Sequence, residues 1–347
     1  SIYDSLHDIL REYQSVLLDE SKVNYALYCL IPEICRKLDE PNPSVMMKAV
    51  KNQTEIQNTR EIHIKDGAAV TKFMYWLKTN IGKIPMNEYT AGKKMDSLRQ
   101  EIPEYKDLSF DTICAYGANA AMMHYSAKEK NCAELEQKNF LLVDCGGQYL
   151  EGTTDITRTF VLGELTEEQK KHFTAVVCGM LRLQNARFLY GCNGFNLDIL
   201  SRGVVWEMGI DYQCGTGHGV GSYLNVHEGP NGFRWKRNPA MNHDWIFEEG
   251  MITTDEPGVY IEGSHGIRIE NELLCVKDIQ NEWGQFMRFE TLTYAPIDLD
   301  GIDVAYMQDK DVELLNAYHV EVYKKLLPYL NEEEQLWLRN ATRQLKR

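Results

Sequence analysis

The sequence predicts an α+β protein built from two similar halves. Helical stretches precede strand-like stretches twice along the 347 residues, and carboxylates stand at the ends of strand-like stretches in both halves. A doubly wound parallel sheet would instead alternate single strands with single helices along the chain. The order of the elements therefore favours a duplicated α+β unit.

The composition is that of a globular chain and argues against two classes of partner. Hydrophobic residues make up 44% and charged residues 25% of the sequence, which suffices for a sizeable core. The formal net charge of −14 argues against nucleic acid as the main partner, because phosphate binding requires a basic surface. No apolar run is long enough to span a bilayer, so we expect no membrane partner.

Cysteine usage predicts a reducing, cytoplasmic location. The nine cysteines are odd in number and scattered, and no CxxC pair occurs, which favours free thiols over disulfides. No signal peptide is visible. The sequence begins SIYDSLHD without a methionine, so we expect further residues to precede it in the natural protein.

The first elements read as the tail of a preceding domain followed by a long helix. Residues 1–45 hold a short helix, a strand at 15–21, a segment at 24–38 and the proline-flanked link EPNPS. From about Lys48 the pattern becomes helical and continues to Asn80. One face of this helix is expected to be buried, because apolar residues recur there at helical spacing. They are Ile62, Val70, Phe73 and Leu77.

The rest of the first half is predicted to form a helix and then strands. The helix covers about 88–101, and the text SFDTICAYG reads as a strand at 109–117. Two further strands, at 139–146 and 158–163, flank a glycine-rich turn. The first half thus ends in a set of strands.

The second half opens with two predicted helices. Thr166 followed by Gln169 fits a capping box that begins a long helix, which we expect to end near Gly191. Asn196 is expected to cap the next helix, at 197–209.

Strands and two more helices complete the second half. The glycine-punctuated, strand-like stretches are 215–230, 250–263, 266–278 and 286–297. Residues 231–247 are expected to form a solvated loop with an aromatic anchor, and two helices are predicted from about Asp303.

The turn between the strands of the first half carries two aspartates. Asp144 ends the apolar run LLVD, and Asp155 follows after Gly146, Gly147 and Gly152. Two carboxylates that face each other across such a turn repel unless a positive charge lies between them. An ionised carboxylate in a buried strand is also costly without a partner.

Five residues in strand-like text could together supply a site for that positive charge. They are Asp144, Asp155, His218, Glu256 and Glu270. Each taken singly is more often a cap, a turn residue or a packed histidine. Together they form an oxygen-rich set without thiolate, which suits two divalent cations about 3.5–4 Å apart. Ligands of this hardness favour Mn²⁺ or a similar ion.

The motifs that contain these residues carry a resemblance to a known family. DCGGQYLEGTTDITRT, GTGHGVGSYLNVHEGP, TDEPGVY and GIRIENE occur in this order. The sequence from about residue 45 to 347 resembles the long form of the Xaa-Pro aminopeptidase (aminopeptidase P) family. The resemblance implies the pita-bread fold, an α+β fold with pseudo-twofold halves and a curved antiparallel sheet, as in creatinase and methionine aminopeptidase.

The resemblance also implies a division of the chain and an assembly. Residues 1–45 would be the C-terminal remnant of a preceding creatinase-like domain, so the chain would lack most of the N-terminal domains. Residues 46–300 would be the catalytic pita-bread domain and residues 301–347 a helical C-terminal extension. The family pattern further implies a homodimer.

The family pattern assigns a role to each metal ligand. Asp144 would bind one metal alone, and Asp155 and Glu270 would bridge both metals. His218 and Glu256 would complete the second metal, and Glu256 would also move protons. The two ions would be Mn²⁺, with Zn²⁺ or Co²⁺ as alternatives, and a metal-bridging hydroxide would be the nucleophile.

The same resemblance assigns roles to residues around the metals. His124 would contact the substrate, and His227 would steady the scissile carbonyl. Arg268 and Tyr260 would orient the first metal ligand. Cys214 stands where many relatives have a histidine that lines the proline pocket, so the shape of that pocket is expected to differ.

The implied activity is hydrolysis of the N-terminal Xaa-Pro bond of peptides with proline in the second position. The alternatives within the fold are a prolidase-type dipeptidase and a methionine aminopeptidase. A non-catalytic peptide-binding relative and a metal-free creatinase-like enzyme are disfavoured, because all five ligands are present. His265 is placed at the rim of the cleft, and the histidines expected to be structural are His7, His63, His172, His243 and His319.

Overall fold

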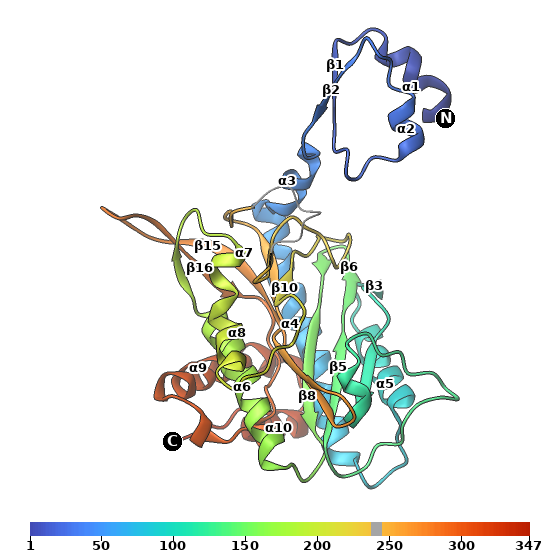
Figure 1. Ribbon diagram of the computed structural model, residues 1–347. Coiled ribbons are helices and arrows are strands. Elements are labelled where there is room, and N and C mark those ends of the chain that lie inside the picture. The colour runs from blue at the N-terminus through green and yellow to red at the C-terminus, as the bar shows by residue number, and fades with distance from the viewer. Residues whose placement is uncertain (237–244) are drawn as a thin grey trace. The chain divides into compact units, whose positions relative to one another are not determined.

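The computed structural model describes residues 1–236 and 245–347 (Figure 1). They form two compact units, residues 1–48 and residues 49–347 without the segment that is not described. His243 and part of the loop expected at 231–247 lie outside the described residues. Among the residues described, no helix is both long and apolar enough to cross a membrane.

The smaller unit contains a pair of short parallel strands with helices around them. Strand β1 pairs with β2 with Ser15 opposite Arg36. Its small core consists of Leu10, Leu18, Ile31 and Cys35. Its elements are α1 (Ile2–Leu10), β1 (Ser15–Leu18), α2 (Tyr25–Cys29), β2 (Arg36–Asp39) and α3 (Pro43–Ala49), the last of which runs into the larger unit.

The larger unit begins with the two helices that the sequence predicts. They are α4 (Gln53–Asn80) and α5 (Glu88–Gln100). Asn52 caps α4, and Glu55 completes a capping box, which explains why the helix begins there. The predicted apolar face is confirmed, because its residues are at most 3% exposed: Ile62, Val70, Phe73 and Leu77.

The strands of the larger unit pair antiparallel in small sheets. In the first half these are β3 (Tyr105–Leu108), β4 (Ile113–Tyr116), β5 (Phe140–Cys145), β6 (Gly147–Tyr149), β7 (Gly152–Thr153) and β8 (Ile156–Val161). In the second half they are β9 (Arg187–Leu189), β10 (Gly217–His218), β11 (Gly232–Phe233), β12 (Ile252–Asp255), β13 (Gly258–Ile261), β14 (His265–Arg268), β15 (Asn271–Asn281) and β16 (Gly284–Thr291). The sheet orders are β3-β6-β7, β4-β5-β8, β12-β15-β16-β9, β13-β14 and β10-β11.

The helices of the second half differ from the prediction at two points. Helix α6 (Glu167–Gln184) begins at the predicted capping box, but it does not reach Gly191. Residues Arg187–Leu189 instead form β9, because β16 offers them a partner strand. Asn193, not Asn196, caps the next helical segment, which is α7 (Gly194–Leu197) followed by α8 (Ile199–Trp206).

Two further stretches of the second half, one predicted as a strand and one as a loop, also differ from the prediction. Of residues 215–230 only β10 is a strand, and the remainder is loop. Within the expected loop at 231–247, β11 pairs with β10 and Phe233 is buried.

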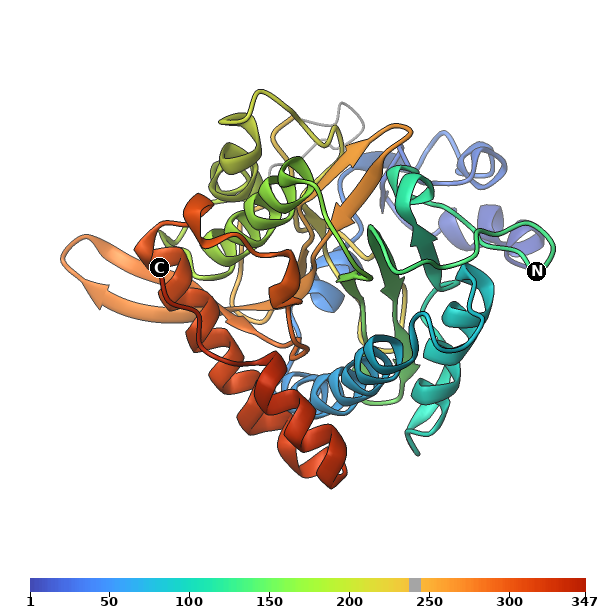
Figure 2. The same cartoon turned by 90° about the horizontal axis from the view of Figure 1, so that it is seen from below.

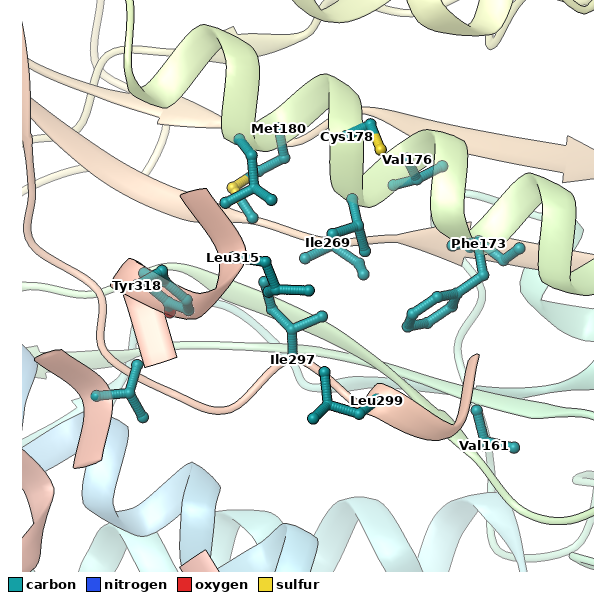
Figure 3. Close-up of a cluster of buried hydrophobic side chains, with 14 of the residues drawn as sticks. Val161, Phe173, Val176, Cys178, Met180, Ile269, Ile297, Leu299, Leu315 and Tyr318 are labelled. Carbon is teal, nitrogen blue, oxygen red and sulfur yellow. The ribbon is translucent and has the colours of Figure 1, made fainter. Parts of the chain in front are cut away.

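The C-terminal helices share the main core of the larger unit. They are α9 (Asp309–Leu326) and α10 (Glu332–Ala341), and both were predicted. Leu315 of α9, Phe173 of α6 and Ile297 belong to one hydrophobic cluster, and all three are fully buried (Figure 3). In Figure 2 the strands lie between α6 (green) on one side and α4 (blue) with the C-terminal helices (red) on the other. Short 3₁₀ turns lie at Gly117–Ala121, Leu299–Gly301, Val304–Tyr306 and Leu327–Tyr329.

Candidate metal centre

The five predicted ligands come from five separate places in the larger unit. Asp144 lies in β5, and Asp155 stands directly before β8. The antiparallel register places Asp144 opposite Thr157, so the hairpin itself brings the two aspartates together. His218 lies in β10, Glu256 directly follows β12, and Glu270 links β14 to β15. Strand pairing thus gathers residues that are far apart in the sequence.

The distances place four of these residues in one cluster. Ligand atoms of Asp155, His218 and Glu270 lie within 4.8 Å of one another. His218 Nε2 lies 3.4 Å from Asp155 Oδ2 and 3.4 Å from Glu256 Oε1. Asp144 is close enough to add to the negative field at Asp155 and at Glu270.

The cluster concentrates negative charge in a buried place. Burial, and then the charges of Asp144 and Glu256, raise the pKa of Asp155 well above its usual value. Burial, and then the charge of Asp155, raise the pKa of Glu270 in the same way. Without cations, ionisation of Asp155 and Glu270 is therefore unfavourable in the folded chain.

The donor set fits two divalent cations. Asp144 Oδ1 is buried and has no hydrogen-bond partner in the described part of the chain, so it is available as a ligand. Four carboxylates and one imidazole match the hard ligands that divalent ions such as Mn²⁺ accept. Bound cations would also remove the repulsion between the buried carboxylates.

Arg268 and Thr157 hold two of the carboxylates from behind. Arg268 Nη2 donates to Asp144 Oδ2 at 2.5 Å, and Nη1 donates to the hydroxyl of Tyr260 at 2.8 Å. The hydroxyl of Thr157 donates to Glu270 Oε2 at 2.7 Å and accepts from Arg268 Nε at 3.1 Å. The predicted pair Arg268 and Tyr260 therefore lies where it can orient Asp144, and Thr157 joins it.

Two predicted histidines lie on the exposed side of the cluster. The ring of His227 packs edge to face on His218 with centroids 4.2 Å apart. Burial, and then the neighbouring His218, lower the pKa of His227, and the nearby His124 acts in the same direction. The loop that carries His124 is tied down by Glu88, which accepts from the backbone of Tyr116 and Ala133.

Cys214 lies in the wall beside the cluster. Its side chain is partly buried and packs against the main core. Burial, and then the charge of Glu256, raise the pKa of the Cys214 thiol to about 11. The thiol is therefore protonated near neutral pH, which suits a residue that lines a pocket better than a thiolate ligand.

Two residues near the cluster were missed by the sequence prediction. Glu272 accepts the backbone N–H of Asp155, and His63 forms an ion pair with Glu272. Burial alone lowers the pKa of His63, but the facing Glu272 carboxylate outweighs it, so this pKa lies above its usual value. The available signal for Glu272 was its position in an apolar strand-like stretch, where a buried carboxylate requires a partner.

His265 is buried rather than placed at the rim of the cleft. It is 0% exposed, and its Nε2 lies 3.0 Å from Nδ1 of His172. The hydroxyl of Ser264 lies 2.8 Å from the other ring nitrogen. The expectation for His265 was wrong because it rested on distance along the sequence, whereas β14 turns this side chain toward α6.

The buried histidine pair predicts a loss of stability on acidification. Burial, and then His172, lower the pKa of His265 to about 4. Because this value lies below that of about 6.5 in an unfolded chain, stability is lost as the pH falls from 6.5 toward 4. Urea unfolding should show a loss of about 1–2 kcal/mol between pH 7 and pH 5 beyond that of His265→Gln. Identical pH dependence in both chains would contradict this.

Comparison with known proteins identifies the family. Residues 57–277 match the model of metallopeptidase family M24, and residues 285–345 match the C-terminal region of peptidase M24. "Aminopeptidase P1" of Arabidopsis thaliana is 38% identical over 94% of this chain and 54% of its own length. A "Probable Xaa-Pro aminopeptidase P" of Paracoccidioides brasiliensis is 41% identical over 85% of this chain and 48% of its own length. The chain thus spans about half the length of these curated relatives.

Solved structures agree with this assignment. The X-prolyl aminopeptidase of Caenorhabditis elegans, described as a cytosolic enzyme with a di-nuclear active site, superposes with a TM-score of 0.91 and 32% identity. The match covers 99% of this chain and 57% of that chain. An Xaa-Pro dipeptidase from Bacillus anthracis gives a TM-score of 0.67 and 26% identity over 86% of this chain and 78% of its own. These likenesses confirm the predicted pita-bread fold, and the chain belongs to metallopeptidase family M24.

Proposed function

We propose that this chain is the catalytic part of a dinuclear metal-dependent aminopeptidase that hydrolyses the N-terminal Xaa-Pro bond of peptides. The observation that carries the proposal is the buried cluster of four carboxylates and one histidine. The names of the relatives from Arabidopsis and Paracoccidioides, and the di-nuclear site of the nematode protein, support it.

The five clustered residues would hold the two ions. Asp144 would bind one ion, Asp155 and Glu270 would be shared, and His218 and Glu256 would bind the other. When bound, a pair of divalent cations acidifies a water molecule and polarises the scissile carbonyl. Mn²⁺ is our proposed ion, because the donor set is rich in oxygen and free of thiolate.

The remaining residues would position the peptide and move protons. The lowered pKa of His227 keeps its ring neutral near pH 7, so that it can donate one hydrogen bond to the carbonyl oxygen. His124 would contact the substrate from its exposed loop. Glu256 lies at the open side of the cluster, 22% exposed, where it would carry a proton to the leaving proline nitrogen.

A dedicated proline pocket follows from the chemistry of the substrate. The nitrogen of an Xaa-Pro bond carries no hydrogen, so a peptidase cannot grip it through an N–H donor. The ring must be recognised by shape instead. The small, protonated Cys214 side chain would form part of that wall, and Arg268 with Tyr260 would keep Asp144 in place.

The domain division, the assembly and the location also remain proposals. Residues 1–45 would belong to a preceding creatinase-like domain, 46–300 to the catalytic domain and 301–347 to a helical extension. Exposed apolar residues on and beside α8, such as Leu200 and Trp206, support a homodimer. The cysteine pattern supports a cytoplasmic location.

Metal-dependent hydrolysis of short peptides tests the proposal. The chain, freed of metal with a chelator and reloaded with Mn²⁺, should cleave Arg-Pro-Pro but neither an Xaa-Pro dipeptide nor a Met-Ala peptide. Preference for the dipeptide would indicate a prolidase-type enzyme. A chain that bound no metal and cleaved none of the three would favour a peptide-binding relative.

A further inference from the structure

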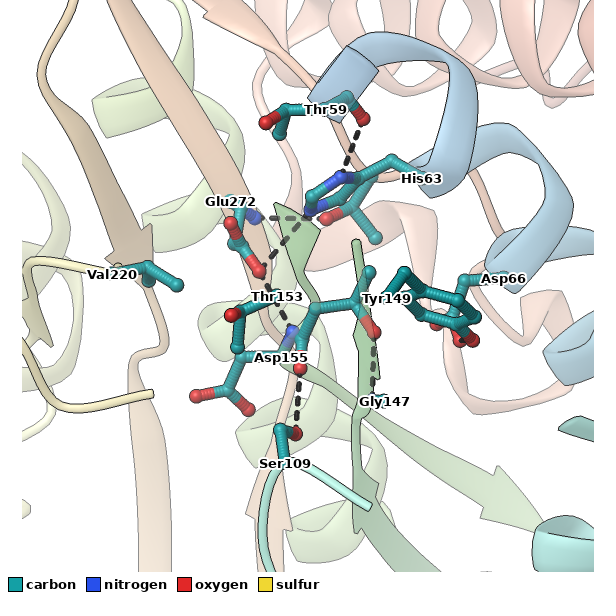
Figure 4. A network of polar contacts seen from close by, with 12 residues as sticks. Thr59, His63, Asp66, Ser109, Gly147, Tyr149, Thr153, Asp155, Val220 and Glu272 are labelled. Atoms are coloured by element: carbon teal, nitrogen blue, oxygen red, sulfur yellow. Dashed lines mark hydrogen bonds and ion pairs between the residues drawn. The ribbon is translucent and has the colours of Figure 1, made fainter. Parts of the chain in front are cut away.

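A second layer of polar contacts lies behind the candidate metal centre, on the side of α4. The backbone N–H of Asp155 donates to Glu272 Oε1 at 2.7 Å, across 117 positions of sequence (Figure 4). Glu272 is 0% exposed and lies on β15, directly after Glu270 and Asn271. The backbone of one candidate ligand is therefore fixed by a buried carboxylate that is not itself a predicted ligand.

His63 holds this buried carboxylate in place. Its Nε2 lies 3.1 Å from Glu272 Oε1, as an ion pair whose angle departs from that of a hydrogen bond. Its Nδ1 lies 2.8 Å from the carbonyl oxygen of Thr59, one turn earlier in α4. Because a carbonyl can only accept, Nδ1 carries a hydrogen, and the ring is locked between helix and carboxylate.

The same face of α4 also grips the turn that precedes Asp155. The hydroxyl of Tyr149, in β6, donates to Asp66 Oδ1 at 2.6 Å, and Arg99 Nε donates to the same oxygen at 2.6 Å. A Cβ at Gly152 would lie 3.2 Å from Thr59 Oγ1, so this turn runs close against the helix. His63 and Asp66 are three positions apart and share one helical face.

We propose that His63 is a positioning residue for the metal centre: by fixing Glu272 it sets the backbone of Asp155, and with it the carboxylate that the two cations would share. This inference rests on the proposed function, because it assigns His63 a purpose at that site. Groups that orient metal ligands commonly contribute 10- to 100-fold to metal affinity. His63 would act through Glu272 and would not touch metal or substrate.

The alternative is that His63 only stabilises the fold. Its loss would leave Glu272 buried without its ion-pair partner, which is costly in any protein. The test therefore requires a measurement that does not change when stability alone changes. Mn²⁺ affinity, measured on variants matched for stability, supplies it.

The experiment compares variants of the 347-residue chain by calorimetric titration with Mn²⁺ and by urea unfolding without metal. His63→Leu removes the ion pair. His63→Gln places an amide N–H near the Nε2 position, whereas His63→Asn is too short to reach Glu272. His172→Gln serves as the matched control, since it removes a buried histidine whose described partner is His265.

We expect His63→Leu to bind Mn²⁺ about 10- to 100-fold more weakly than the wild type. His63→Gln should recover most of that loss, and His63→Asn should not. His172→Gln should bind Mn²⁺ as the wild type does, even where its stability falls as far. Low-temperature EPR of the Mn²⁺-loaded variants should show the signal of paired ions weakened in His63→Leu.

Two results would overturn the proposal. The first is wild-type Mn²⁺ affinity in His63→Leu, or a loss no larger than that of His172→Gln. The second, which applies even where His63→Leu fails to fold, is equal affinity in His63→Gln and His63→Asn. A wild-type chain that bound no Mn²⁺ would instead contradict the proposed function, and this proposal with it.

Discussion

Replacing Asp155 with asparagine is expected to abolish peptide hydrolysis while making the metal-free chain harder to unfold. Activity should fall about a thousandfold or more, because Asp155 is the ligand that we propose the two cations share, and both would be displaced by its loss. Stability should rise because burial, and then Asp144 and Glu256, disfavour the ionised Asp155 carboxylate in the folded chain. Asparagine removes that charge and keeps the shape.

The pH dependence of this gain has a definite sign. The pKa of Asp155 is raised in the folded chain, so the unfolded chain releases its proton first, near pH 3.9. Asp155 therefore costs the wild type stability as the pH rises above this value, and the variant lacks this contribution. Urea unfolding in a chelator at pH 5 and pH 8 should show the gap between the two chains widen.

Saturating Mn²⁺ should reverse the order of stability, because only the wild type gains the full binding energy of the ions. Asp107→Asn is the control, since Asp107 is exposed on β3, and it should change neither activity nor metal binding. A fully active Asp155→Asn chain, or one that unfolds more easily than the wild type without metal, would contradict this account.

The sequence was sufficient to locate the candidate site because its signals are local. Asp144 ends an apolar strand, and glycines mark the turn after it, where a Cβ at Gly146 would lie only 1.9 Å from the carbonyl oxygen of Thr154. Asp155 ends that turn. Both aspartates can therefore be recognised within about twenty residues of sequence. Strand pairing then brings His218 and Glu270 to the same place.

The contacts that support the candidate ligands could not be predicted from the sequence, because they join residues that are far apart along the chain. The contact between Glu272 and Asp155 spans 117 positions, and nothing in the helical text around His63 reveals that it faces a carboxylate. The end of α6 was misplaced for the same reason. Its continuation pairs with β16, a strand about one hundred residues further on, and tertiary pairing overrode the local helical pattern.

The two C-terminal helices share the hydrophobic core of the larger unit, which the sequence did not predict. Leu315 and Val322 of α9 are fully buried in the same core as Phe173 of α6. The helical text predicted these two helices correctly. It could not show that their apolar faces complete the core beneath the candidate site.

Arg158 joins these helices to the metal centre, and replacing it with methionine should cost about 3–5 kcal/mol of unfolding free energy. The guanidinium is 1% exposed. It donates to the carbonyl of Glu270 at 2.6 Å, to Asn271 Oδ1 at 2.8 Å and to the hydroxyl of Tyr318 at 2.8 Å. Its other acceptors are the carbonyls of Thr157, Ala295 and Pro296.

The large effect is expected because methionine would remove six hydrogen bonds made by one buried guanidinium. The carbonyls of Thr157 and Ala295 keep other donors, the N–H of Glu270 and the hydroxyl of Tyr318. Tyr318→Phe removes one hydroxyl from the same network and should cost only about 1 kcal/mol, measured by the same urea unfolding. Since Arg158 binds the carbonyl of Glu270, Arg158→Met should also weaken Mn²⁺ binding, whereas Tyr318→Phe should leave it nearly unchanged. Equal losses in the two variants would show that Arg158 acts through its contact with Tyr318 alone, and that the metal centre does not depend on it.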